Sequence, residues 1–229
     1  NAQNIKLVLD IVVNKAKEEK LIVVVSAFSK ITDLLQLASQ KAAAGDESFK
    51  EILADLETKH LDALKELIPV SEQSSLLSHI KRIINHLETL LDGCYLLGEL
   101  SPRTSDTILS FGELLSSYII AEALKQKLKN SSYKDSRELI KTNNSFGKAV
   151  VNFDVSNKLI VDFFASNENQ VVVMPGFIAA SLDGINTTLG RGGSDYTAAI
   201  LAGALHANEL EIWTDVNGMF TANPKIVKQ

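Results

Sequence analysis

Cysteine is almost absent from the chain, and this scarcity excludes several kinds of site. The single cysteine, Cys94, leaves no partner for an internal disulfide, which is compatible with a reducing compartment. It lies between glycine and tyrosine in a leucine-rich helical stretch, which favours a small core residue over a nucleophile. One cysteine also cannot form a zinc knuckle. We therefore expect a fold without disulfide bonds.

Several common catalytic signatures are missing too. The four histidines do not have the His-Glu-x-x-His spacing of zinc hydrolases. The chain has neither a Walker A phosphate loop nor the Gly-x-Ser-x-Gly elbow of serine hydrolases. We therefore expect no metal site built from side chains alone, and neither P-loop nor serine-hydrolase chemistry.

Blocks of basic residues and long apolar runs are also lacking. Acidic residues outnumber basic ones by 28 to 23, a formal charge of −5, which argues against a nucleic-acid or acidic membrane surface. The longest apolar runs, near 21–28 and 171–180, are too short to span a bilayer, and the first residues lack the order of a signal peptide. We expect a cytoplasmic protein with small-molecule partners, and neither nucleic acid nor membrane.

The hydrophobic pattern indicates an α/β protein. Continuous β-branched runs predict strands buried on both faces, as in a parallel sheet that helices cover on both sides. Helical periodicity separates these runs, so the elements alternate. The predicted strands are 21–26, 170–174 and 210–214, and the predicted helices beside them are 4–17, 155–166 and 195–207.

A long helical section interrupts this alternation. Residues 31–128 are rich in leucine and lysine at helical spacing and give almost no strand signal. Helix-breaking residues near Gly45, Pro69 and Pro102 divide the section into about four helices. We predict one domain over 1–229, a three-layer αβα sandwich with a mostly parallel central sheet, with these helices inserted on one side.

Residues 188–196, Thr-Leu-Gly-Arg-Gly-Gly-Ser-Asp-Tyr, form the most informative stretch. Three glycines allow a sharp turn and a close approach to a ligand, while Ser194 or Asp195 is placed to cap the helix that follows. A helix start attracts anions, and Arg191 adds a planar fork that suits a carboxylate or phosphate. Taken alone, the stretch is equally compatible with an anion cradle and with an ordinary capped turn.

Further candidates lie after a predicted strand and inside the helical section. Ser26 ends the run at 21–26, and Thr32 follows shortly after, where open α/β sheets bind ligands. These two side chains could equally cap the next helix. Glu113 lies in an apolar helical stretch, so we expect it to face either water or a cationic ligand group.

The last predicted strand is followed by a polar turn. Thr214 and Asp215 come directly after that strand, and Asn-Gly then marks a turn before Phe220 and Lys225. Such groups suit a lid over adenine and phosphate. They also suit an ordinary loop.

Taken together, these motifs resemble those of aspartate kinases, members of the amino-acid kinase fold, in both order and spacing. The resemblance extends over the whole chain and is nearest to the kinase portion of fused aspartokinase–homoserine dehydrogenases. The matching blocks are Val-Val-Val-Ser-Ala at 23–27, Lys-Ile-Thr-Asp at 30–33, Phe-Gly-Glu at 111–113, the stretch at 188–199, and Glu-Ile-Trp-Thr-Asp-Val-Asn-Gly-Met-Phe-Thr-Ala-Asn-Pro-Lys at 211–225.

The resemblance implies transfer of the γ-phosphoryl group of ATP to the β-carboxylate of L-aspartate, giving 4-phospho-L-aspartate, the first step toward lysine, threonine and methionine. By resemblance, Arg191 holds the α-carboxylate of aspartate and Glu113 its α-ammonium group. Ser26, Thr32 and Ser194 contact the rest of the substrate.

The same resemblance assigns the phosphate and nucleotide end. Gly192 and Gly193 offer backbone N–H groups to the substrate or the transferring phosphate, and Asp195 orients the cationic and metal machinery around them, with ATP and Mg²⁺ as the implied cofactors. A homo-oligomer is implied as well. Nucleotide contacts are assigned to Thr214, Asp215, Phe220 and Lys225.

The chain also departs from the family pattern. It starts after the family's Lys-Phe-Gly-Gly strand and stops before its regulatory domains, and Phe220, Asn223 and Lys225 stand where tyrosine, aspartate and arginine are usual. We therefore expect impaired activity and either low stability or oligomerisation for this chain alone. The alternatives are a non-catalytic module that binds aspartate or nucleotide, and another amino-acid kinase acting on glutamate or acetylglutamate.

Overall fold

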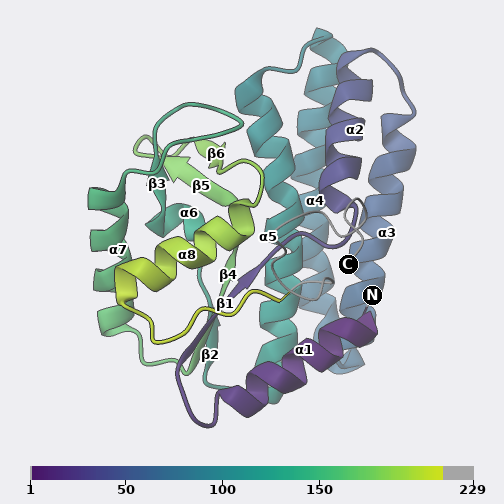
Figure 1. Cartoon of the computed structure of the whole chain (residues 1–229). Coiled ribbons are helices and arrows are strands. Elements are labelled where there is room, and N and C mark those ends of the chain that lie inside the picture. The colour runs from purple at the N-terminus through teal and green to yellow at the C-terminus, as the bar shows by residue number, and fades with distance from the viewer. Residues whose placement is uncertain (1, 214–229) are drawn as a thin grey trace, which may run out of the picture.

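The core of the fold is a parallel three-stranded sheet. The computed structural model describes residues 2–213. Strand β4 (Val171–Pro175) lies between β1 (Leu21–Val25) and β2 (Ser131–Tyr133), and both neighbours run parallel to it, with Val23 and Tyr133 each paired with Val173 (Figure 1). The β-branched runs at 21–26 and 170–174 therefore form strands as predicted.

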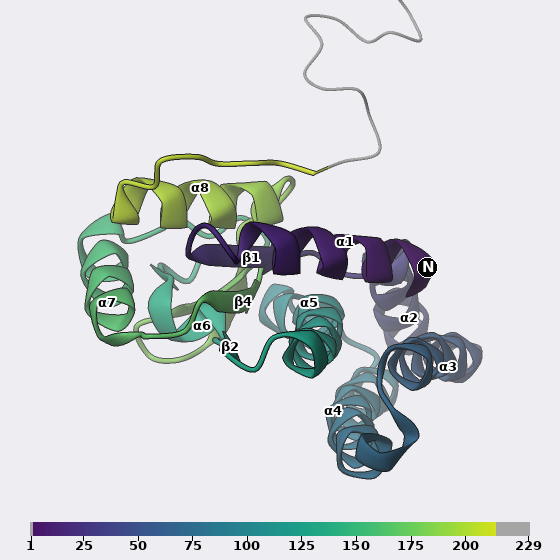
Figure 2. The ribbon, with the colours of Figure 1, turned by 90° about the horizontal axis from the view of Figure 1, so that it is seen from below.

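Each face of this sheet is buried under helices. Val171 and Val173 pack with the helical section, whereas Val172 and Met174 pack with α7 (Phe153–Ser166) and α8 (Gly193–Leu205). Side chains alternate across a strand, so one apolar run supplies both cores. Figure 2 shows the resulting layers, with α8 and α5 on opposite sides of β1 and β4. The three-layer αβα prediction is confirmed.

The predicted helical insertion is present as four helices. They are α2 (Ile31–Ala43), α3 (Phe49–Leu67), α4 (Val70–Leu97) and α5 (Pro102–Lys127), separated at the predicted glycine and proline positions. Pro69 is the N-cap of α4, and the Ser101 hydroxyl accepts a hydrogen bond from the N–H of Thr104 at 3.1 Å. Cys94 is buried in this layer, as expected for a core residue.

Helix α5 is the central element of the molecule. It contacts all three strands of the parallel sheet on one side and helices α2, α3 and α4 on the other. By length and composition alone it could cross a membrane, yet 67% of its apolar window is buried inside the protein. The apolar character of α5 is thus explained by its place between the sheet and the other helices.

A second, smaller sheet was not predicted. Strands β3 (Lys141–Thr142) and β5 (Ile178–Ser181) pair in parallel, and β6 (Asn186–Thr188) pairs antiparallel with β5. Between β2 and β3 lies the short helix α6 (Ser136–Leu139). These strands are too short for a periodicity of two to be recognised. Through β6 the second sheet leads directly into the glycine-rich stretch.

Two sequence predictions need correction at the ends of the chain. The predicted helix at 4–17 is α1 (Ala2–Lys15), which starts and ends two residues earlier. Residues 210–213 form no strand within the described part of the chain, and Thr214 lies outside it. A strand requires a hydrogen-bonded neighbour, and Leu210 and Ile212 instead remain 44% and 54% exposed.

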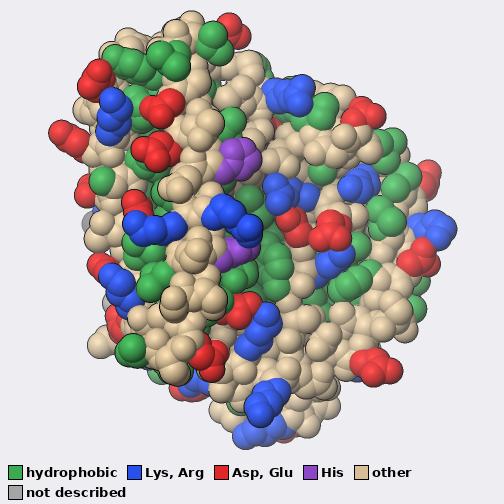
Figure 3. Space-filling view, turned by 180° about the vertical axis from the view of Figure 1, so that it is seen from behind, with side chains coloured by type: hydrophobic (Ala, Val, Ile, Leu, Met, Phe, Trp, Pro, Cys, Tyr) green, Lys and Arg blue, Asp and Glu red, His purple; other side chains and the backbone are tan. Residues whose placement is uncertain are grey.

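The surface opposite the view of Figure 1 carries interspersed charges. On this face lysine and arginine side chains alternate with aspartate and glutamate side chains, without an extended patch of one sign (Figure 3). Elsewhere in the described residues, too, opposite charges pair, such as Lys158 with Asp162 within α7 and Lys50 with Glu47 at the start of α3. The face therefore offers no broad basic surface for a polyanion.

Candidate active site

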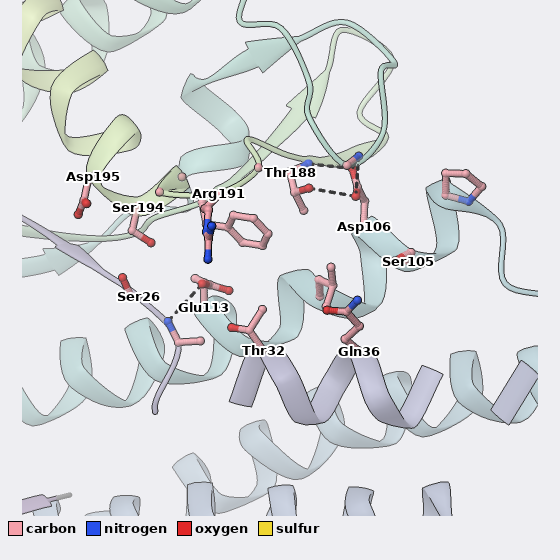
Figure 4. A pocket seen from close by; sticks show the side chains of 18 residues that line it. Ser26, Thr32, Gln36, Ser105, Asp106, Glu113, Thr188, Arg191, Ser194 and Asp195 are labelled. Carbon is pink, nitrogen blue, oxygen red and sulfur yellow. Dashed lines mark hydrogen bonds between the residues drawn. The ribbon is translucent and has the colours of Figure 1, made fainter. Parts of the chain in front are cut away.

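A cavity of about 580 Å³ opens at the carboxyl ends of β1 and β4. Because the strands are parallel, both ends lie at the same edge of the sheet, where open α/β proteins bind ligands. Eight of the residues predicted from sequence line this one cavity (Figure 4). They are Ser26, Thr32, Glu113, Arg191, Gly192, Gly193, Ser194 and Asp195.

The glycine-rich stretch makes a tight turn above the cavity. Gly190 and Gly192 have φ values of 77° and 72°, which only glycine adopts without strain. Helix α8 then begins at Gly193 with Gly192 as its N-cap, so the expectation that Ser194 or Asp195 caps the helix is wrong. The left-handed turn starts the helix earlier than predicted, and this leaves both side chains in the first turn at the cavity.

The start of α8 offers hydrogen-bond donors to the cavity. Among the described residues, the N–H groups of Gly192, Ser194 and Asp195 have no acceptor. The N–H of Gly193 donates to the carbonyl of Gly190 at 3.0 Å, so the expectation that Gly193 also offers its N–H is not met in this structure. Free N–H groups at a helix N-terminus bind anions, and the helix dipole strengthens this preference.

Close backbone packing holds this helix start against the end of β4. A Cβ atom added at Gly176 would lie 2.6 Å from the Cβ of Ser194, and one added at Gly193 would lie 2.7 Å from the Phe177 ring. In addition, the N–H of Phe177 donates to the Thr197 hydroxyl at 3.0 Å. The donors of α8 are thus fixed relative to the sheet.

The opposite wall comes from the segment between β1 and α2. Helix α2 has Lys30 as its N-cap, with φ of 67° and no side-chain cap. Neither Ser26 nor Thr32 therefore caps this helix. Both side chains line the cavity instead, Ser26 at the end of β1 and Thr32 on the first turn of α2.

Glu113 is the buried acid of the cavity. It is only 4% exposed, which excludes the solvent-facing alternative. Its Oε1 accepts a hydrogen bond from the N–H of Ala27 at 3.2 Å, while its Oε2 has no partner among the described residues. Burial raises the pKa of this carboxyl from 4.5 to about 7, partly opposed by the Ala27 hydrogen bond. A cation in the cavity would complete its bonding.

Arg191 faces Glu113 across the cavity. Figure 4 shows the guanidinium of Arg191 directed from the glycine turn toward the Glu113 carboxyl, with Ser26 and Thr32 on either side. Arg191 is exposed, and it makes no ion pair within residues 2–213. One buried anionic group and one free cationic group therefore face the same space. This arrangement suits a ligand that carries both charges.

Asp106 is a site residue that the sequence prediction missed. It lines the cavity two helical turns before Glu113 and is 1% exposed. Its carboxylate accepts hydrogen bonds from the N–H of Gly147 and from the N–H and hydroxyl of Thr188. The available signal was the spacing of seven residues, which places two acids on one helix face.

The predicted nucleotide residues Thr214, Asp215, Phe220 and Lys225 lie outside the described residues.

Within residues 2–213 no cluster of three or more metal-ligating side chains is present. Asp195, exposed on the first turn of α8, is the carboxylate beside the free N–H groups. Mg²⁺ in phosphoryl-transfer sites is commonly held by one or two carboxylates together with substrate phosphates, and this donor set fits that pattern.

Comparison with curated proteins finds aspartokinases over the whole chain. The chain is 33% identical over its full length to a chloroplastic bifunctional aspartokinase/homoserine dehydrogenase 2 of Arabidopsis thaliana, of which it spans 25%. It is also 33% identical to the lysine-sensitive aspartokinase 3 of Escherichia coli, matching 95% of this chain and 47% of that protein. The chain thus spans between a quarter and about half of these relatives.

The fold agrees with solved aspartokinase structures. Aspartokinase III of Escherichia coli in complex with aspartate and ADP matches 99% of this chain and 49% of its own, with a TM-score of 0.87 at 32% identity. The same enzyme in complex with lysine and aspartate gives a TM-score of 0.82. The model of the amino acid kinase family matches residues 1–229. The chain therefore belongs to the amino acid kinase family.

Proposed function

We propose that this chain is the catalytic domain of an aspartate kinase, which transfers the γ-phosphoryl group of ATP to the β-carboxylate of L-aspartate and forms 4-phospho-L-aspartate. The observation that carries the proposal is the pair of opposite charges in the cavity. Glu113 presents a buried, unpartnered oxygen, and Arg191 faces it without an ion pair in the described residues. A free α-amino acid carries the complementary pair of charges.

The two charged groups divide the recognition of the amino acid. Glu113 holds the α-ammonium group, which supplies the missing partner of Oε2. Arg191 holds the α-carboxylate through its planar fork, and Ser26 and Thr32 hydrogen-bond the remainder of the substrate. An N-acylated amino acid has no ammonium charge and would leave Glu113 buried without a partner. The site is therefore suited to a free amino acid rather than to acetylglutamate.

The start of α8 receives the transferring phosphoryl group. The free N–H groups of Gly192 and Ser194 point their dipoles toward negative charge, while Gly193 allows the close contact with Phe177 that fixes them. Asp195, together with the phosphates, would hold Mg²⁺, which would supply neutralisation of charge on the nucleotide. Thr214, Asp215, Phe220 and Lys225 are proposed to hold the nucleotide. In phosphoryl transfer the protein contributes mainly alignment and charge stabilisation.

The proposal is tested by acyl phosphate formation. The full-length protein with Mg-ATP and L-aspartate is expected to give a product that hydroxylamine traps as a hydroxamate. L-Glutamate and N-acetyl-L-glutamate serve as competing substrates and should give none. Absence of hydroxamate with aspartate would contradict the proposal. Binding of aspartate by calorimetry without turnover would support a non-catalytic binding module instead.

The wider assignments follow from the same proposal. The product would enter the synthesis of lysine, threonine and methionine. A homo-oligomer stays a prediction, which light scattering of the full-length protein tests. The cytoplasmic location also stays a prediction, because the similar proteins include chloroplastic plant enzymes.

A further inference from the structure

Asp106 is a buried carboxylate whose bonding is already complete. Oδ1 accepts from the N–H of Gly147 at 2.9 Å and from the hydroxyl of Thr188 at 3.0 Å. Oδ2 accepts from the N–H of Gly147 at 3.0 Å and from the N–H of Thr188 at 2.9 Å. All donors come from two segments that are 41 and 82 residues away in sequence. The side chain therefore joins α5 to two distant pieces of chain.

Both of these pieces lead to the turn that carries Arg191. Thr188 is the last residue of β6 and precedes the turn directly. The carbonyl of Gly147 lies 3.3 Å from the position that a Cβ atom at Gly190 would occupy, so the turn rests on Gly147. The carbonyl of Thr188 also accepts a hydrogen bond from the N–H of Ala149 at 2.9 Å. Asp106 thus fixes both the start of the turn and the backbone beneath it.

The same helix carries the other half of the amino-acid site. Glu113 follows Asp106 by seven residues, which is two turns of α5 and about 10 Å along its axis. Figure 4 shows both side chains directed from α5 into the cavity, with Arg191 above Glu113 and Thr188 beside Asp106, to which it is hydrogen-bonded. The rigid helix α5 therefore sets the distance between Glu113 and Asp106. Under the proposed function, Glu113 binds the ammonium group and Asp106 anchors the loop whose Arg191 binds the carboxylate.

We propose that Asp106 is a positioning residue of the aspartate site, which holds Arg191 at the correct distance from Glu113 by binding Gly147 and Thr188. It acts through the loop and does not contact the substrate itself. This inference rests on the proposed function, because the quantity that Asp106 controls is the separation of the two groups assigned to the amino acid.

The first experiment measures KM and kcat of the full-length protein with Asp106→Ala. The KM for aspartate is expected to rise about tenfold or more, while the KM for ATP changes less than about twofold. Asp106→Asn should rescue it in part, because the amide oxygen can accept both N–H groups and the amide nitrogen can donate to the Thr188 hydroxyl, although this nitrogen also faces the N–H of Gly147. A fall in kcat with both KM values unchanged would overturn the proposal and indicate a purely structural role.

A matched pair of threonines and a double mutant sharpen this test. Thr188→Val removes a hydroxyl bonded to Asp106, whereas Thr187→Val removes an equally buried hydroxyl bonded to Thr142 at 2.7 Å. Only the first should raise the KM for aspartate.

In a background of Arg191→Ala, Asp106→Ala should raise the KM for aspartate by less than about a further twofold, because both changes act on the same contact. Independent, additive effects would contradict the proposal.

Hydrogen exchange separates this inference from the proposed function. In Asp106→Ala, or in Thr188→Val if the first variant fails to fold, amides of 143–150 and 188–193 should exchange faster, while those of β4 should not. If the unmodified protein formed no acyl phosphate but this local effect appeared, the proposed function would fail and the anchoring would stand. Unchanged exchange in both segments would refute the anchoring itself.

Discussion

Helix α5 places two buried carboxylates at opposite ends of one cavity, and the two ends are completed in different ways. At one end, Asp106 accepts hydrogen bonds from two backbone N–H groups and a hydroxyl. At the other, Glu113 accepts from the single N–H of Ala27 and keeps one oxygen unpartnered within residues 2–213. The two side chains are almost equally buried, at 1% and 4% exposure. Their difference lies in bonding, not in burial.

This difference separates a structural contact from a binding contact. A buried carboxylate that its own protein satisfies contributes to the fold, whereas an unsatisfied one costs free energy until a ligand arrives. The end at Asp106 therefore belongs to the framework, and the end at Glu113 is the one that the proposed function assigns to the ligand. Each of the following tests acts on one of these ends.

Neutralising Glu113 should give the largest effect, and that effect is on stability. Its pKa is raised from 4.5 to about 7, so between these values the folded protein binds a proton that the unfolded chain releases. The contribution of the protonated Glu113 carboxyl to stability is thus fully present below about pH 4.5, and it is lost as the pH rises through about 7. Glu113→Gln should therefore raise the free energy of unfolding by about 3 kcal/mol at pH 8 and by much less at pH 5.

Urea unfolding of both proteins at the two pH values measures this difference. Glu88→Gln, at an exposed position on α4, is the control and should change stability little at either pH. Equal effects of Glu113→Gln at pH 5 and pH 8 would show that the Glu113 carboxyl is not destabilised by burial. The same variant should bind aspartate more weakly, so that saturation needs a higher concentration, and stability and function therefore oppose one another at this end.

Removing Arg191 tests the partner that Glu113 faces. The loss of one charge-assisted contact costs about 1.5–3 kcal/mol, so Arg191→Ala should raise the KM for aspartate about 10- to 150-fold. The KM for ATP should stay nearly constant. The control is Lys148→Ala, which removes an exposed cation beside Gly190 that does not line the cavity. Equal losses for aspartate and ATP would contradict the role of Arg191 as the carboxylate clamp.

Filling the contact between β4 and α8 tests whether the framework is as rigid as the bonding of Asp106 suggests. Gly176→Ala would place a Cβ atom 2.6 Å from the Ser194 side chain, and the required shift should cost about 1–3 kcal/mol of stability. The control is Gly203→Ala on α8, where the added Cβ atom would have nothing within 4 Å. This variant should instead stabilise the protein by about 0.5–1 kcal/mol. Melting temperatures that shift in the same direction for both variants would show that the start of α8 moves freely to accommodate the added Cβ atom.

The central fold was predictable because its signals are local. The β-branched runs at 21–26 and 170–174, and the helix breaks at Gly45, Pro69 and Pro102, depend on neighbouring residues only. The second sheet was missed because its strands have two to four residues each. The strand predicted at 210–214 was wrong for residues 210–213, since an apolar run becomes a strand only where a neighbour pairs with it.

The site residues also divide into those that a local motif identifies and those that depend on distant contacts. Ser26, Glu113 and Arg191 could be named because each lies in a motif, and the cavity brings them together. Asp106 was missed, because its donors are 41 and 82 residues away and its own surroundings, Thr-Ser-Asp-Thr, look like an ordinary polar helix face, which leaves its spacing from Glu113 as the available signal. Whether Glu113 is satisfied by the protein or left for a ligand is likewise decided by tertiary contacts. Sequence therefore identified the binding end more fully than the framework end.

The smallest predicted effect concerns the protons that accompany aspartate. An ammonium group bound at Glu113 favours the ionised carboxylate. Below about pH 7 a fraction of the Glu113 carboxyls is protonated, and aspartate binding should release the proton from this fraction. The apparent Kd for aspartate should then rise up to tenfold per unit as the pH falls below about 7, and stay constant above about 8. Asp106, Arg191 and Asp195 also line the cavity, so Glu113→Gln provides the control. Calorimetry at pH 6 in two buffers of different ionisation enthalpy should detect proton release in the unmodified protein and none in the variant. Equal release in both would show that Glu113 is not the source of the proton and would remove the distinction between the two carboxylates of α5.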